Sequence, residues 1–356
     1  MKTKLLIISL LSIYLLSGCN RLDSVNEVPE GQYAQGFVLS HTDDGTMIRI
    51  FSPWEAGKVM AELTVQDDQP YCRLATNSAT QAGFIHALGA DSLVAGYCSP
   101  HLIYSKRAGA MDLGSDLSLD AERILRANAD IVLLSTYQQD DKNAEVLRKI
   151  GTPVIPINEW TEVHPLARAE WIRVIGVLVG KQAEADSIFR EVKAHYEALA
   201  AQPKQAERLS VVSGGTWQGT WYVPSGRTYM AQLFRDAGLA YRYEADSTKG
   251  SLPLSFEQAL LDFKDADIWV GAPAKSLDEL QQIDSKHSWF KAFKNGQVYN
   301  LYKRTTPEGG NDFWETGVVR PDLVLQDFIS IETGQTDSLY FASALNEDRM
   351  QNMPSK

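Results

Sequence analysis

The sequence predicts an α/β protein of two lobes that a long helical segment joins, with a small β appendage on the N-terminal side. The first observation is an alternation of short apolar strands with helices of about ten residues, which is typical of parallel sheets. The second is the stretch 163–202, which interrupts this alternation and carries apolar residues at helical spacing alone. The third is the length of 356 residues, which leaves room for two lobes.

Residues 1–18 are typical of a secretion signal. Lys2 and Lys4 precede an apolar run from Leu5 to Leu16, which is too short to span a bilayer as a helix. Small residues then precede Cys19, an arrangement that resembles a bacterial lipobox, so we expect lipidation of this thiol. An ordinary signal peptide with an incidental cysteine is the alternative. The predicted location is the cell envelope, with a polar tether at 19–32 and a lipid anchor that leaves the protein facing the periplasm.

Residues 33–70 form the predicted β appendage. Alternating residues on both sides of Asp43-Asp44-Gly45 indicate a hairpin, because Asp-Gly favours the tight turns that join antiparallel strands. A further strand at 58–65 completes a small antiparallel sheet. The sequence does not indicate a role for it.

Residues 71–162 form the predicted N-lobe. Glycines close two of its helices, and Ile131 to Ser135 is its strongest apolar strand. The expected strands are 73–76, 93–97, 131–135 and 153–157, and the expected helices are 78–88, 119–128 and 142–150.

The helical segment at 163–202 contains two apolar-periodic stretches, His164 to Val179 and Gln182 to Ala201. Only Gly180 stands out between them, so we expect a rod of about 35 residues and about 50 Å. A rod of this kind predicts that the lobes close by a small angle, because a continuous helix lacks flexible hinge strands.

Residues 203–335 form the predicted C-lobe, where the α/β alternation resumes, and 336–356 a C-terminal tail. The expected strands are 209–213, 268–270 and 297–302, and the expected helices are 229–237, 255–261, 277–283 and 321–331.

Composition excludes several classes of function. The formal charge is 34 − 45 = −11, and removal of the signal segment takes away two lysines and gives 32 − 45 = −13, so nucleic acid is not an expected partner. Three cysteines are too few for a disulfide scaffold, and whether Cys72 and Cys98 pair stays open. The chain has no nucleophile elbow, phosphate loop or His-Glu-x-x-His motif, which leaves a cell-envelope hydrolase as the weaker alternative of a different class.

Two matching segments connect the lobes to a known family. Glu122-Arg123-Ile124-Leu125 is followed by Ala129-Asp130-Ile131-Val132-Leu133, and Leu254 to Leu260 is followed by Ala266-Asp267-Ile268-Trp269-Val270. With the lipobox and the layout of 70–335, these segments resemble the helical-backbone, or class III, periplasmic substrate-binding lipoproteins of ABC importers for iron-siderophores, haem and cobalamin. Ala129 stands where that family usually has proline. Gly309 to Asp327 and Trp217 to Tyr229 are also similar to family segments.

The resemblance implies two Rossmann-like lobes, no catalytic residue and no resident cofactor. It implies a monomer that binds a metal chelate and docks on an ABC permease with its ATPase. Family members pair one glutamate of each lobe with permease arginines, and the motif matches place these at Glu122 and Glu257. The alternative is that both are ordinary first-turn helix acids that interact with the helix dipole.

Loops after parallel strands face the ligand crevice in open α/β sheets, which selects an aromatic set with a few cations. Planar rings suit a bulky flat ligand, and arginine suits carboxylate or catecholate oxygens. The expected ligand-binding residues are Tyr97, His101, Tyr104, Tyr137, Trp217, Trp221, Tyr222, Arg227, Arg304, Asn311 and Trp314. Trp171 and Trp269 are expected in the core.

Arg227, Lys303 and Arg304 favour an anionic chelate, so a ferric siderophore comes first, cobalamin second and haem third. The six histidines are scattered without a pair at metal-ligand spacing, and a direct metal site is not predicted. Only His101 lies in an expected cleft loop, where it is a candidate axial ligand for haem iron or cobalt.

Overall fold

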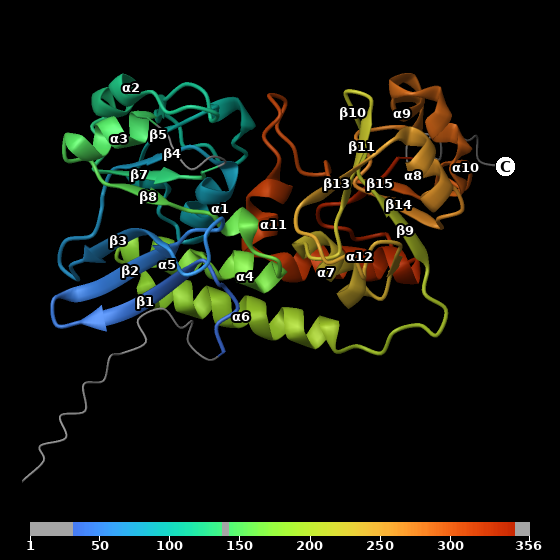
Figure 1. Ribbon diagram of the computed structural model, residues 1–356, viewed down its shortest axis with the longest axis horizontal. Coiled ribbons are helices and arrows are strands. Elements are labelled where there is room, and N and C mark those ends of the chain that lie inside the picture. The colour runs from blue at the N-terminus through green and yellow to red at the C-terminus, as the bar shows by residue number, and fades with distance from the viewer. Residues whose placement is uncertain (1–30, 137–141, 346–356) are drawn as a thin grey trace, which may run out of the picture.

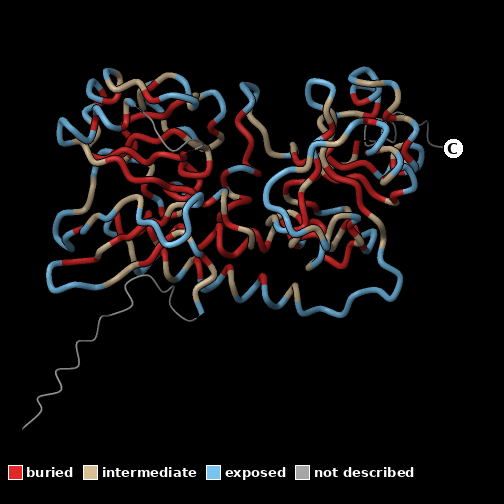
Figure 2. The backbone as a smooth tube through the Cα atoms, in the orientation of Figure 1, coloured by how far each residue is buried: buried red, intermediate tan, exposed pale blue. Residues whose placement is uncertain are grey.

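The computed structural model describes residues 31–136 and 142–345. The expectations for 1–18, for Cys19 and for Tyr137 lie outside these residues. Figure 1 shows two lobes side by side, with the long helix α6 (Gln182–Ala200) running beneath both. Buried backbone is concentrated in the sheets of the two lobes and in the segment between them (Figure 2). Among the described helices, none is long and apolar enough to cross a membrane.

The N-lobe is a parallel sheet of order β6-β5-β4-β7-β8 with helices packed beside it. Strands β4, β5, β7 and β8 are short and buried along their whole length, which explains their continuous apolar sequences, whereas the edge strand β6 is partly exposed. Their bounds are β4 Leu74–Thr76, β5 Val94–Tyr97, β6 Met111–Asp112, β7 Ile131–Leu134 and β8 Val154–Pro156, and the helices are α1 Ala79–Ala87, α2 Ala121–Arg126 and α3 Lys142–Lys149. All seven predicted elements are present within about two residues of their expected ends.

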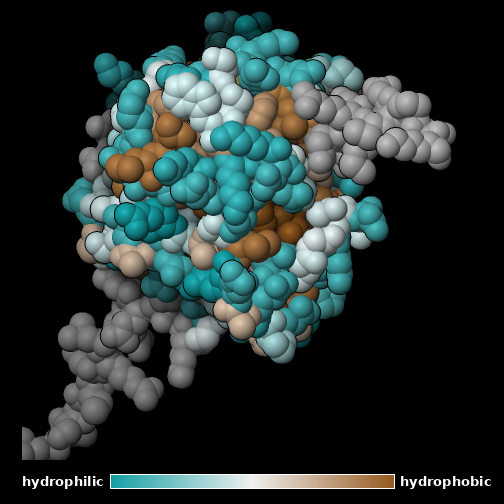
Figure 3. Space-filling model, turned by 90° about the vertical axis from the view of Figure 1, so that its right-hand side faces the viewer, coloured by the Kyte–Doolittle hydropathy of each residue, from teal (hydrophilic) through white to brown (hydrophobic). Residues whose placement is uncertain are grey.

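The C-lobe has a second sheet of order β12-β9-β14-β15-β16, parallel except for its last strand. A separate antiparallel sheet, β10-β11-β13, packs beside it. The strands are β9 Ser210–Ser213, β10 Gly215–Trp217, β11 Thr220–Pro224, β12 Ala240–Tyr241, β13 Ser251–Leu254, β14 Ile268–Val270, β15 Val298–Asn300 and β16 Ser343–Ala344. The helices are α7 Tyr229–Ala237, α8 Phe256–Phe263, α9 Leu277–Ile283, α10 Lys291–Lys294, α11 Thr316–Val319 and α12 Pro321–Thr333. The outer side of this lobe is mostly hydrophilic, with hydrophobic residues in separate clusters (Figure 3).

The predicted rod is wrong in its continuity. The segment forms three helices, α4 Pro165–Glu170, α5 Ile172–Leu178 and α6. Gly180 adopts a left-handed φ of 68°, and Lys181 N donates to Gly176 O, which ends α5 with a typical glycine cap. Helix α6 then packs back against α5, where Gly176 lies against Ala185. At about 28 Å, α6 is the longest helix that connects the lobes.

The expected C-terminal tail is also partly wrong, because residues 336–345 belong to the C-lobe. Phe341 is buried, and β16 pairs with β15. The Asp327 carboxylate accepts hydrogen bonds from the backbone N–H groups of Tyr340, Phe341 and Ala342 at 2.6, 2.7 and 2.9 Å. This buried carboxylate holds residues 340–342 against α12.

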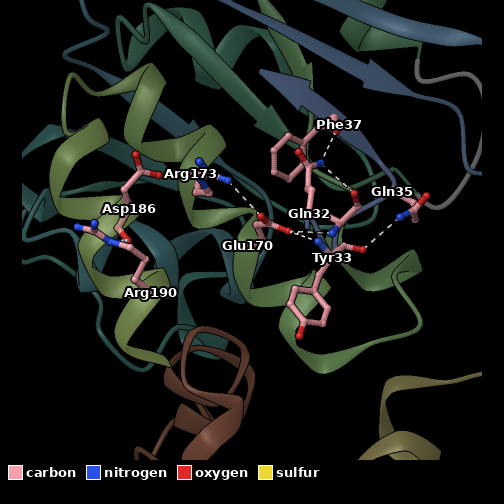
Figure 4. A network of polar contacts seen from close by, with 9 residues as sticks. Gln32, Tyr33, Gln35, Phe37, Glu170, Arg173, Asp186 and Arg190 are labelled. Atoms are coloured by element: carbon pink, nitrogen blue, oxygen red, sulfur yellow. Dashed lines mark hydrogen bonds and ion pairs between the residues drawn. The ribbon is translucent and has the colours of Figure 1, made fainter. Parts of the chain in front are cut away.

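The N-terminal appendage is a three-stranded antiparallel sheet, β1 Phe37–Thr42, β2 Gly45–Phe51 and β3 Val59–Val65, with the predicted hairpin between β1 and β2. Figure 4 shows the segment that leads into it held on α4. The Glu170 carboxylate accepts from Tyr33 N at 2.8 Å and Ala34 N at 2.9 Å, and it pairs with Arg173 at 3.1 Å. The appendage is therefore fixed to the connecting helices by a buried acceptor.

Candidate functional site

A cavity of about 510 Å³ lies between the lobes, at the carboxyl ends of strands from both parallel sheets. Each lobe supplies one wall, so a ligand in the cavity would contact both. The N-lobe wall consists of Asn77, Ser78, Ala79, Thr80, Cys98, Ser99, Leu102, Ile103 and Asp116. The C-lobe wall consists of Lys275, Tyr302, Thr305, Thr306, Pro307, Gly309, Asn311 and Trp314.

The N-lobe wall is built by the ends of β4 and β5. Asn77 is buried and its Oδ1 accepts from Ser135 N at 2.7 Å, which ties the end of β4 to the end of β7. Ser78 is the N-cap of α1 and accepts from Thr80 N at 3.3 Å. Beyond β5, Ser99 Oγ donates to Asp116 Oδ1 at 2.6 Å. These bonds hold the polar groups of this wall in place before any ligand arrives.

Apart from Lys275, which follows β14, the C-lobe wall is the segment after β15, whose shape depends on its own polar contacts. Asn311 is buried, its Nδ2 donates to Leu301 O at 3.1 Å, and its Oδ1 accepts from Phe313 N at 3.0 Å. Thr305 and Asn311 form a β-bridge that closes the loop. The exposed part of the loop then leaves the ring of Trp314 on the cavity surface.

The lobes touch directly beside the cavity. The buried Glu315 carboxylate accepts from Ser105 N at 3.0 Å and Ser105 Oγ at 2.5 Å, and it also accepts from Tyr104 N. Burial raises the pKa of Glu315, and the hydrogen bonds from the 104–105 segment oppose that rise in part. A Cβ on Gly83 would lie 2.7 Å from the backbone of Glu315, and one on Gly310 would lie 2.7 Å from the backbone of Ile103. The contact surface between the lobes, which we call the seam, is thus tight enough to require glycine at both places.

A buried ion pair lies deeper in the seam. Arg168 Nη2 is 3.5 Å from Glu159 Oε1, and both side chains are almost fully buried. The Arg168 guanidinium lies 4.2 Å from the ring centre of Tyr229, the first residue of α7 in the C-lobe. Burial raises the pKa of Glu159, and the Arg168 charge offsets part of that rise. The pair therefore connects the end of the N-lobe to the C-lobe.

A family model described as periplasmic binding protein matches residues 74–305 of the chain, which include the whole N-lobe wall of the cavity and the C-lobe wall as far as Thr305. The chain belongs to the periplasmic binding protein family. Proteins of this family bind substrates for transport and are not enzymes. The two-lobed α/β fold with a cavity between the lobes is the fold expected of such a protein.

Relatives and solved structures agree with this membership. An uncharacterised lipoprotein of Methanocaldococcus jannaschii is 24% identical over 313 residues, which are 83% of this chain and 72% of that protein. A second uncharacterised lipoprotein of that organism is 24% identical over 204 residues, and the match covers 51% of its length. A periplasmic binding protein from Veillonella parvula has a TM-score of 0.59 at 12% identity, covering 84% of this chain and 98% of the other.

Two further structures share the fold. The periplasmic haem-binding protein of Vibrio cholerae has a TM-score of 0.57 at 17% identity, covering 71% of this chain and 98% of that chain. An ABC-type Fe3+-hydroxamate transport protein from Saccharomonospora viridis has a TM-score of 0.56 at 17% identity, covering 76% of this chain and 96% of that chain. At these identities the likeness concerns the fold alone.

Of the residues predicted to bind ligand in this periplasmic binding protein, Asn311 and Trp314 lie on the cavity. Tyr97 does not, because its side chain is 1% exposed within the N-lobe core, where its Oη accepts from Arg107 N at 3.3 Å. His101 is exposed in a short 3-10 helix outside the cavity lining. The ring of Tyr104 also lies outside the lining and faces Arg304, whose guanidinium is 5.5 Å from the ring centre.

The stretch 217–229, expected as a loop, begins as the hairpin of β10 and β11. Gln218 and Gly219 have φ of 48° and 84°, which the tight turn of this hairpin requires. Successive side chains of a strand point to opposite faces, so the aromatic residues of this hairpin lie on two different faces. Trp221 is fully buried against Trp269 with ring centres 5.1 Å apart, so its expected place in the cleft is wrong. Tyr222 points to the opposite, exposed face, as does Trp217, which is 67% exposed, and neither lines the cavity.

The expected cations do not line the cavity either. Arg304 Nε is 2.5 Å from the buried Asp312 carboxylate, and its guanidinium lies 4.6 Å from the Tyr340 ring centre. Lys303 Nζ donates to Leu339 O at 2.5 Å, and Arg227 is exposed away from the lining. Sequence reasoning missed Asp116 and Lys275, the charged residues that do line it; their positions after strands were the available signal.

The predicted docking glutamates occupy equivalent positions. Glu122 and Glu257 are exposed, and each is the second residue of its helix, after the N-caps Asp120 and Ser255. Helices α2 and α8 lie on different lobes, on the side away from α6 (Figure 1).

The aspartates of the same two motifs have a structural role. Asp130 accepts from Cys72 N and Arg73 N at 2.9 and 3.0 Å, at the start of β4. Asp267 accepts from Ser210 N at 2.8 Å, at the start of β9. Each motif thus joins the beginnings of two neighbouring parallel strands.

No disulfide joins Cys72 and Cys98. Cys72 precedes β4, whereas Cys98 follows the neighbouring strand β5, so they lie roughly 15 Å apart along the sheet. Within residues 31–136 and 142–345, no group of three or more His, Cys, Asp or Glu side chains is arranged to hold a metal ion.

Proposed function

We propose that this chain is the substrate-binding lipoprotein of an ABC importer, and that it captures a metal chelate, a ferric siderophore first of all, in the cavity between its lobes. The observation that carries the proposal is the cavity itself. It has about 510 Å³, and walls from both lobes meet at the carboxyl ends of their parallel strands. Cobalamin and haem are the alternative ligands of the same class. The solved structures that share the fold include an Fe3+-hydroxamate transport protein and haem-binding proteins.

The lipid anchor is the second part of the proposal. The segment around Cys19 resembles a lipobox, and two relatives are lipoproteins by name. Anchored this way on the periplasmic face of the envelope, one copy of the chain delivers its ligand to the permease. Metabolic labelling with a fatty acid tests it: the wild-type protein incorporates label, and a Cys19→Ala variant does not.

Docking is the third part. Glu122 and Glu257 project from first turns on different lobes, which suits recognition of two separated cationic sites by one molecule. We expect the double substitution of Glu122→Ala and Glu257→Ala to abolish chelate uptake by cells while the dissociation constant of the chelate is unchanged. Glu184→Ala is the matched control, because Glu184 is an exposed first-turn glutamate of α6, on the other side of the molecule. A loss of chelate affinity in the double variant would contradict docking as the role of the pair.

Native mass spectrometry of the soluble body tests chelate capture. The protein is incubated separately with a ferric siderophore, cobalamin and haemin. A one-to-one complex with one of them supports the proposal. Binding of none, together with hydrolase activity on envelope substrates, would replace the transport assignment of this chain with that of an enzyme.

A further inference from the structure

The cavity walls carry one charge of each sign. Of its described lining residues, Asp116 and Lys275 alone have side chains that are charged at neutral pH. Burial raises the pKa of the Tyr302 phenol, which therefore stays neutral. Asp116 comes from the N-lobe wall and Lys275 from the C-lobe wall, so the formal charge of the lining sums to zero.

Both charged groups remain available to a ligand. Asp116 uses Oδ1 to accept from Ser99 Oγ, and within the described part of the chain its Oδ2 has no hydrogen-bond partner. Lys275 is exposed, and its backbone N–H, not its ammonium group, donates to Glu279 Oε2 at 2.7 Å. No ion pair joins the two residues to each other. A ligand with a hydrogen-bond donor at one end and an acceptor oxygen at the other fits both.

The remaining lining is uncharged and of two kinds. Hydroxyl and amide groups come from Ser78, Thr80, Ser99, Thr305, Thr306, Asn77 and Asn311, and apolar surface comes from Ala79, Leu102, Ile103, Pro307 and Trp314. A polyanionic chelate usually requires several arginines in bidentate contact. The arginine closest in sequence to this wall, Arg304, is already paired with Asp312. The lining therefore does not support the anionic ligand that Arg227, Lys303 and Arg304 led us to expect.

We infer that the ligand is a metal chelate without net charge, of the hydroxamate or amide type, and that Asp116 and Lys275 determine this specificity. The inference rests on the proposed function. Three hydroxamates neutralise a ferric ion, whereas three catecholates leave a trianion. A trianion in this cavity would face the Asp116 carboxylate with the Lys275 ammonium as its only cationic partner among the described lining residues. At an effective dielectric constant of about 30, a unit charge about 8 Å away changes affinity by about tenfold for each unit of ligand charge, and so by roughly a thousandfold for a trianion.

The test compares the dissociation constants of a neutral ferric trihydroxamate and a trianionic ferric tricatecholate, measured by tryptophan fluorescence and native mass spectrometry at fixed salt. The wild-type protein should bind the trihydroxamate at least about tenfold more tightly, because the trianion gives up hydration that a lining of zero formal charge does not replace. Asp116→Asn should shift the ratio of the two constants about tenfold or more toward the tricatecholate, and Lys275→Gln should shift it the other way. Asp265→Asn and Lys264→Gln make the same changes in charge at exposed positions outside the lining and should leave the ratio unchanged.

Tighter binding of the tricatecholate by the wild-type protein would overturn the inference and leave chelate capture intact. An unchanged ratio in both Asp116→Asn and Lys275→Gln would overturn the role of these two residues. If the folded protein binds none of the four ligands, which are the trihydroxamate, the tricatecholate, cobalamin and haemin, the proposed function fails, and the inference fails with it.

Discussion

Substitution of Gly83 by alanine tests whether the seam between the lobes is rigid. In an isolated helix this change would stabilise α1 by about 1 kcal/mol. In the structure, the new Cβ would lie 2.7 Å from Cα and C of Glu315, roughly 1 Å closer than carbon atoms normally approach. The three nearest atoms all belong to the backbone of Glu315, which cannot rotate away. Helix α1 and the Glu315 segment must therefore separate.

The cost follows from two effects. Overpacking of this kind costs about 1–3 kcal/mol, and separation weakens the hydrogen bonds that the buried Glu315 carboxylate accepts from Tyr104 and Ser105, at about 1–3 kcal/mol for a lost partner. After the helix gain is subtracted, we expect Gly83→Ala to lower the free energy of unfolding by about 1–5 kcal/mol. Chemical denaturation followed by circular dichroism measures this difference.

The control is Gly317→Ala. A Cβ there would lie 3.4 Å from Phe313 and 3.5 Å from Val324, which is ordinary contact, so we expect stability within about 1 kcal/mol of the wild-type value. Gly310→Ala, whose Cβ would lie 2.7 Å from the backbone of Ile103, should behave like Gly83→Ala. A Gly83→Ala protein as stable as the wild type would refute the reasoning, because helix propensity would then outweigh the seam contact.

Two further predictions concern the C-lobe. Burial raises the pKa of Asp267, but hydrogen bonds from Lys291 and Ser210 outweigh that effect and hold it below its usual 3.8. We therefore expect Asp267→Asn to lose about 1–3 kcal/mol of unfolding free energy at neutral pH. That difference should vanish as the pH falls through the lowered pKa, and urea titrations that show it unchanged in acid would contradict this account. Trp221→Ala should cost about 3–5 kcal/mol because Trp221 is a core residue, whereas Trp217→Ala, on the exposed face, should stay within about 0.5 kcal/mol; equal losses in thermal denaturation would count against these placements.

Local sequence patterns predict the α/β elements well and the connection between the lobes less well. The strand at 268–270 and the helices at 229–237 and 277–283 have the bounds that apolar spacing and caps indicate. Gly180 is the instructive exception. A glycine inside an apolar-periodic stretch is compatible with a continuous helix, and its left-handed φ depends on α6 packing back against α5.

The candidate site was less predictable, since side-chain direction and pairing are properties of the folded chain. Trp221 and Tyr222 are neighbours in sequence, and the hairpin sends one into the core and the other to the surface. Arg304 forms an ion pair with Asp312, which lies eight residues away in the sequence and is itself buried. Asn311 and Trp314 could be predicted, because the loop that carries them follows the last parallel strand.

We propose above that a chelate is held in the cavity between the lobes. Ala79 lines this cavity at the start of α1, and a tryptophan there would fill part of its volume of about 510 Å³. The most direct measurement is the dissociation constant of the best-bound chelate for the wild-type protein and for Ala79→Trp, with circular dichroism to verify that both are folded. We expect a one-to-one complex for the wild type and no measurable binding for the variant. Equal affinity in both proteins would contradict it.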